Sequence, residues 1–89
     1  MSVFVIAHNS SGAVGEPVVM GLHEAVDELD PSDMPPGGTI RVVSAFGTVW
    51  IMQKDAAGVL NIEINHAFES YIHALTQRFP DATITFLID

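Results

Sequence analysis

The sequence predicts an α+β domain in which an antiparallel sheet of four to five strands forms one layer and two helices form the other. The elements are expected in the β-α-β-β-α-β order of the ferredoxin-like layout. The chain has 89 residues, which fits one domain, so residues 1–89 are predicted to form a single small acidic unit. Segments rich in β-branched and aromatic residues alternate along it with two segments whose apolar residues follow helical spacing.

The first half of the chain is predicted to contain one strand and one helix. Residues 2–8, SVFVIAH, are apolar on both faces, which is typical of a central strand covered on both sides. Pro17 suits the first turn of a helix ending at Asp30, because a residue before proline disfavours the α conformation. The apolar side of that helix would be formed by Val19, Leu22, Val26 and Leu29.

The centre of the chain is predicted to be a hairpin. Residues 38–46 and 47–55 have strand composition and join tightly around Phe46 and Gly47. Residues 56–65 form either a third strand after a turn at 56–58 or a connection to the next helix, and the sequence leaves both possibilities open.

The chain is predicted to close with a helix and a strand. Asn65 is placed to cap a helix over 66–79, and Pro80 and Asp81 end it. Residues 82–89 alternate as a final strand.

Composition restricts the classes of partner. Apolar residues make up 48% of the chain and charged residues 16%, so we expect an apolar patch and a homodimer or higher oligomer, a well-filled monomer being the alternative. The net charge of −8 disfavours direct binding to nucleic acid or anionic membranes and favours basic surfaces. The absence of cysteine excludes disulfides and thiolate chemistry.

The cytoplasm is the expected compartment. The N-terminal segment has no basic leader, and its apolar run is too short for a signal peptide. No stretch approaches the length of a membrane span.

Two patterns could bind a small ligand or a metal ion. Gly12 and Gly15 precede the first predicted helix, but their spacing matches no phosphate-binding motif. His66, Glu69 and His73 share one side of the second predicted helix and could hold zinc or nickel, although a solvated helix face explains them equally. We expect no cofactor and no bound metal.

An enzyme is not predicted. His8 lies close to Ser10 and Ser11, but a serine nucleophile also needs an orienting group and an oxyanion hole, and no motif supplies them. Trp50, Phe46 and Met34 could anchor an interface, although Trp50 could equally fill the core.

The strongest feature is HEAVDELDPSD at residues 23–33, which has five carboxylates and no lysine or arginine. On a helix, like charges at i+3 and i+4 each cost about 0.2–0.5 kcal/mol, and acids near the C-terminal end also oppose the helix dipole. Calcium binding is not favoured, because the spacing does not fit an EF-hand loop. The predicted partner-binding residues are Glu24, Asp27, Glu28, Asp30 and Asp33.

Such a row of carboxylates could occupy a basic groove that normally holds DNA phosphates. In size and charge alone, the chain is similar to small acidic inhibitors made by bacteriophages, and no motif supports a family assignment. We therefore expect a nucleic-acid mimic that blocks a bacterial DNA-handling protein, with gyrase, RNA polymerase, a restriction enzyme and a CRISPR effector as candidates. The alternatives are a structural or regulatory homo-oligomeric interaction module without mimicry, a small-ligand or metal-binding domain, and a patch that serves only solubility.

Overall fold

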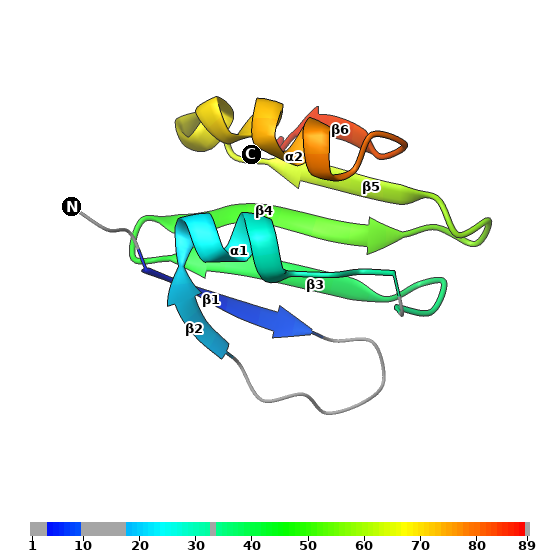
Figure 1. The fold of residues 1–89 in the computed structure, drawn as a ribbon, viewed down its shortest axis with the longest axis horizontal. Helices are drawn as coiled ribbons and strands as arrows, with labels where there is room; N and C mark the ends of the chain where they lie inside the picture. Colours follow the sequence, from blue (N-terminus) through cyan, green and yellow to red (C-terminus); the bar gives the residue numbers. More distant parts are fainter. Residues whose placement is uncertain (1–3, 10–17, 33, 89) are drawn as a thin grey trace.

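A six-stranded mixed sheet carries the helical segments of the described residues on one face (Figure 1). The structure is a computed structural model and describes residues 4–9, 18–32 and 34–88. The strand order across the sheet is β2-β1-β3-β4-β5-β6. The strands are β1 (Phe4–Asn9), β2 (Val18–Gly21), β3 (Thr39–Ser44), β4 (Gly47–Lys54), β5 (Leu60–Ile64) and β6 (Thr83–Phe86). The helical elements are α1 (Leu22–Glu28), the 3-10 helix η1 (His66–Tyr71) and α2 (Ile72–Arg78).

The predicted four-to-five-stranded antiparallel sheet of the ferredoxin-like layout is wrong. The first predicted helix splits into β2 and the short helix α1, and β2 pairs with β1 as an additional edge strand. Val18 and Val19 are β-branched residues that suit a pleated strand better than a helical turn. Gly21 is extended, with φ −69° and ψ 153°, so the helix begins only at Leu22.

The third central strand, which the sequence left open, exists as β5. It follows a turn in which Gly58 has a positive φ of 82°, a conformation that glycine adopts without steric cost. The carboxylate of Asp55 fixes this turn by accepting hydrogen bonds from the backbone N–H groups of Ala57 and Val59, each at 2.9 Å. The predicted turn at 56–58 and the tight β3–β4 connection are therefore confirmed.

The last four elements, from β5 to β6, form a β-α-β unit, which makes the sheet mixed. β6 pairs in parallel with β5, and η1 and α2 form the connection between them. Asn65 starts this connection as predicted, because its side-chain oxygen accepts from the N–H of Ala67 at 2.9 Å. Its amide nitrogen also donates to the carbonyl of Thr48 at 2.9 Å, which ties the start of η1 to β4.

The core lies between the sheet and the helices. A register shift between Val42 and Val43 in the β3–β4 pair accommodates an extra residue on β4, and both Val49 and Trp50 are fully buried there. Trp50 therefore fills the core, although its indole N–H has no hydrogen-bond partner among the described residues. The buried core residues are Val5, Leu22, Ala25, Val26, Met34, Ile40, Val42, Val49, Trp50, Met52, Ile62, Ile64 and Leu75.

The opposite face of the sheet carries no helix of the described chain, and it is called the open face below. This differs from the prediction that the first strand is covered on both sides, because Phe4 and Ile6 are 65% and 42% exposed. Residues paired across neighbouring strands point to the same face, so the register defines its members. They include Phe4, Ile6, Val19, Arg41, Val43, Ile51, Glu63 and Thr85.

Within the described residues, no helix has the length and apolar character that crossing a membrane requires.

Leu75 is the only fully buried residue of α2, and it anchors that helix to the sheet. We expect Leu75→Ala to lower the free energy of unfolding by about 2–5 kcal/mol, because the cavity left behind adds to the lost transfer energy. Urea unfolding followed by the fluorescence of Trp50, the single tryptophan, measures this change. Gln77→Ala on the exposed side of the same helix should change it by less than about 0.5 kcal/mol. Equal effects of the two substitutions would contradict this account of the core.

Candidate functional site

The predicted carboxylates lie on the helical side of the molecule. Glu24, Asp27 and Glu28 are exposed on α1, and Asp30 is exposed in the loop that follows it. Leu22, Ala25 and Val26 bury the other side of the helix, which orients the three acids outward. Asp33 lies outside the described residues. Four of the five predicted site residues therefore share one surface, which is called the acidic face below: Glu24, Asp27, Glu28 and Asp30.

The late start of α1 changes the electrostatics of this helix. The sequence placed all three helical acids in the last turns, but Glu24 stands in the first turn, where the positive end of the dipole favours an acid. Asp27 and Glu28 remain near the C-terminal end, where the dipole disfavours them, and no basic residue stands in the last turn of α1. The unfavourable interaction with the helix dipole therefore involves Asp27 and Glu28 and not Glu24.

A lysine from the sheet fixes the loop after α1. Lys54 Nζ donates to the carbonyl oxygens of Ser32 and Met34 at 2.9 and 2.8 Å. Met34 is buried in the core, and its N–H donates to the carbonyl of Pro31 at 3.0 Å. The interface role considered for Met34 is therefore not favoured, because this side chain packs inside the domain.

An arginine from α2 reaches the other end of the same loop. Arg78 donates to the carbonyl of Leu29 at 3.0 Å, and it thereby satisfies an acceptor just past the end of α1. Two of the three basic residues of the chain thus approach the acidic face, although they are 24 and 48 residues from Asp30 in the sequence. Both bind backbone carbonyls, and no ion pair joins them to a carboxylate among the described residues.

Asp30 is held in its charged form. The backbone N–H of Ser32 donates to its carboxylate at 2.9 Å. This hydrogen bond, and next to it the Ser32 side chain, lower the pKa of Asp30 from its ordinary value of 3.8. Arg78 and Lys54 lower it further by charge attraction. All these causes favour the anion, so this carboxylate stays ionised over the whole physiological range.

Two hollows border the acidic face. One of about 230 Å³ has a mainly apolar lining beside Glu28 and Asp30, formed with Ala7, Val18, Met20, Leu29 and Ile40. The other, of about 330 Å³, lies between the two helices and is lined by His23, Val26, Asp27, Ser70, Tyr71 and Ala74. The rings of His23 and Tyr71 lie 5.6 Å apart at one side of it. Asp27 is thus both an exposed anion and part of a groove.

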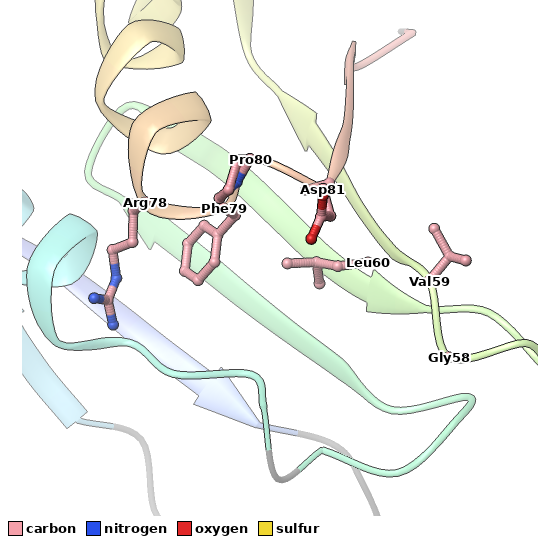
Figure 2. Close-up of a pocket in the computed structure, with 8 residues that line it drawn as sticks. Gly58, Val59, Leu60, Arg78, Phe79, Pro80 and Asp81 are labelled. Carbon is pink, nitrogen blue, oxygen red and sulfur yellow. The ribbon is translucent and has the colours of Figure 1, made fainter.

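A third hollow, of about 410 Å³, lies between the β4–β5 turn and the end of α2 (Figure 2). Its wall includes Phe79, Pro80 and Leu60, and Asp81 points toward Leu60 across it. The guanidinium of Arg78 lies 5.1 Å from the centre of the Phe79 ring and extends toward the loop after α1. The polar side chains of this hollow, Arg78 and Asp81, therefore do not converge on one point, as a nucleophile and a base would need to do.

The His66, Glu69 and His73 cluster is not assembled as a metal site. The ring of His66 stacks on Phe86 with centroids 3.9 Å apart and planes 7° apart. His73 Nε2 is hydrogen-bonded to Gln77 at 3.1 Å. The described part of the chain contains no group of three or more potential ligands. The expectation that the protein binds no metal stays a prediction, and elemental analysis of the purified protein would test it.

The structure describes the remaining candidate residues only in part. Gly12, Gly15, Ser10 and Ser11 lie outside the described residues. Of His8 only the backbone, in β1, is described. Phe46 is 78% exposed at the β3–β4 turn and remains available for contact.

Sequence reasoning missed the open face. The available signal was the pair of β-branched residues Val18 and Val19, which fits a second strand beside the first and therefore a hairpin with one uncovered face. The helical spacing of Val19, Leu22 and Val26 obscured it, because the same residues satisfy both patterns.

The lowered pKa of Asp30 generates a prediction about acid. The pKa of Asp30 is lower in the folded state than in the unfolded state, so ionised Asp30 stabilises the fold. This stabilisation is fully present above the unfolded-state pKa near 3.8, and it is lost as the pH falls through the folded-state pKa. The carboxyl carbon of Asp30 should titrate below 3.8 in a nuclear magnetic resonance experiment. Asp30→Asn should remove this part of the acid dependence of unfolding. A folded-state midpoint at or above 3.8 would disprove the assigned hydrogen bonding.

A scan against protein-family models and searches of curated proteins and of solved structures found no match to this chain. Its function therefore has to be inferred from its own residues and their arrangement.

Proposed function

We propose that this chain is a binding protein that places its acidic face against the basic, nucleic-acid-binding surface of a partner protein and blocks it. The observation that carries the proposal is the set of four exposed carboxylates, Glu24, Asp27, Glu28 and Asp30, none of which forms an ion pair among the described residues. Unpaired exposed anions keep their full charge for a partner, whereas an ordinary solvated helix face interleaves cations with its acids.

The spacing of the charges supports contact with a phosphate-binding groove. Glu24 lies three residues before Asp27 and four before Glu28, so it neighbours both of them on the helix surface, with Cβ atoms roughly 5–6 Å apart. Grooves that bind DNA carry lysine and arginine side chains at several phosphate positions. A short rigid row of anions can occupy such positions without offering a strand to cleave or a base to read.

Arg78 and Lys54 determine which carboxylates matter most. Both cations lie at the loop after α1, where they lower the pKa of Asp30 by charge attraction. Asp30 is therefore partly balanced within the molecule. Glu24 and Asp27 have no hydrogen bond or ion pair with a basic residue among the described residues, and Asp27 also borders the groove between the helices. We expect these two residues to contribute most of the affinity for a basic partner.

The proposal places the protein in the bacterial cytoplasm, where proteins with DNA-binding grooves act. Gyrase, RNA polymerase, a restriction enzyme and a CRISPR effector remain the candidate partners. Catalysis has no part in the proposal. Affinity capture from a bacterial lysate identifies the partner.

The double substitution Glu24→Gln with Asp27→Asn should weaken partner binding about 2- to 30-fold, because each of the two exposed charge pairs contributes roughly 0.2–1 kcal/mol. The stability of the fold should change little, because relief of repulsion offsets the favourable dipole interaction lost at Glu24. Affinity should fall with added salt, since exposed charges are screened within about 10 Å at 0.1 M. Duplex DNA should compete with the protein for the captured partner in a fluorescence anisotropy assay.

A matched control separates the acidic face from net charge alone. Glu63→Gln with Asp81→Asn also changes the net charge from −8 to −6, but neither residue lies on α1 or in the loop after it. This control should bind as the parent does. Equal losses for both double variants would mean that only net charge matters, and simultaneous binding of DNA and protein would rule out the mimic.

A further inference from the structure

The open face has an apolar corner built from three neighbouring strands. In one row across the sheet, Val19 on β2 pairs with Ile6 on β1, and Ile6 pairs with Val43 on β3. Phe4 lies next to this row on β1. Phe4 and Val19 are each 65% exposed and Ile6 is 42% exposed. The corner is defined here as Phe4, Ile6, Val19 and Val43, and solvent contact of this kind is unfavourable for so many adjacent apolar groups.

Electrostatics restricts what can cover this corner. The chain carries a net charge of −8, and most of its described acids lie on the helical side or in turns. Among the charged residues of the paired strands, the open face holds one cation, Arg41, and one anion, Glu63, on either side of Ile51 in a single row. The face is therefore close to neutral. It gives no attraction to a basic partner, and it is a surface by which a second equally acidic molecule can approach without facing the acidic helix.

The pattern of the corner is also self-complementary. The row Val19–Ile6–Val43 has a β-branched aliphatic residue on each side of Ile6. A two-fold axis that runs close to the direction of β1, between two stacked sheets, would place Ile6 against Ile6 and Phe4 against Phe4 of a second copy. The same axis would place Val19 against Val43 of that copy. An isologous interface requires such a match of a surface with itself.

We propose that two copies of this chain associate by packing their open faces together, with the corner at the centre of the interface. Stacked sheets pack about 10 Å apart with strands inclined by about 30°, which allows the side chains of both faces to interdigitate. A standard protein–protein interface buries about 800 Å² of surface on each partner. The four side chains of the corner provide less than this area, so the interface must include more of the open face. The polar part of the open face, including Arg41, Glu63 and Thr85, forms the rim.

This interface is separate from the acidic face. The open face is the side of the sheet opposite α1 and α2, so its occupation leaves Glu24 and Asp27 accessible. Loss of the dimer and loss of partner binding can therefore be measured independently. The dimer does not require the mimic proposal to hold.

The test is light scattering at micromolar concentration on the parent and on two single variants. The parent should give twice the chain mass of 9.6 kDa. Val19→Lys should give the chain mass itself, because each copy would bring a charge into an apolar contact. Val59→Lys is the matched control: it places the same charge at another exposed valine, 42% exposed, just before β5, and it should remain a dimer.

A second interface variant and a measurement of folding distinguish loss of the dimer from unfolding of Val19→Lys. Phe4→Thr keeps a strand-forming residue while removing the aromatic group, and it should raise the dimer dissociation constant at least about 10-fold. Circular dichroism and the emission of buried Trp50 verify that each variant is folded. A parent of single-chain mass, a folded Val19→Lys dimer, or loss of the dimer in Val59→Lys to the same degree would overturn the proposal. A monomeric parent protein that uses this corner to bind vesicles of zwitterionic lipid, or to bind an unrelated protein, would overturn the dimer proposal as well.

Discussion

Coverage of the sheet is the constraint on which the rest of this molecule depends. Two helices of seven residues each and a six-residue 3-10 helix must cover a six-stranded sheet. They suffice for one face, where Trp50, Met52, Ile62 and Ile64 become fully buried. The described chain has no third layer for the other face. A domain of this size with so many apolar residues is therefore divided into a covered side that carries the acids and an uncovered side that carries the surplus apolar groups.

The sequence was sufficient for the parts of the fold fixed by local chemistry. The β3–β4 hairpin, the turn at 56–58, the Asn65 cap and the last strand all depend on residues a few positions apart. It was insufficient where one segment satisfies two periodicities. Val18 and Val19 continue the helical pattern of α1, yet they pair with β1, because hydrogen bonding to a neighbouring strand outweighs a weak helical propensity at β-branched residues. The parallel pairing of β6 with β5 was also not predictable, since strand order is a property of the assembled sheet.

The acidic face illustrates a second limit of sequence reasoning. Positions 23–33 contain no lysine or arginine, and this local pattern suggested uncompensated charge. The fold brings Lys54 from β4 and Arg78 from α2 to the same loop. Their hydrogen bonds go to carbonyl oxygens, so they fix the backbone and only partly offset the carboxylates. Such a long-range approach has no local signal. It does narrow the functional surface, because Asp30 is the carboxylate whose pKa these two cations lower, whereas no hydrogen bond or ion pair joins either cation to Glu24 or Asp27 among the described residues.

The two proposed surfaces have a joint geometric consequence. If the open faces of two copies are packed together, α1 of each copy lies on the outside of the assembly, and the two acidic faces point in opposite directions. One dimer could then not place both acidic faces in a single continuous groove. It would instead bind two basic surfaces at once, and binding of the second would be strengthened only where those surfaces are linked at a compatible distance. A partner that is itself a symmetric oligomer, or that carries repeated basic sites, would therefore retain the dimer more strongly than a partner with one groove. Because the apolar corner would be buried in the dimer, self-association would also keep an apolar surface away from other proteins while leaving the charged surface free.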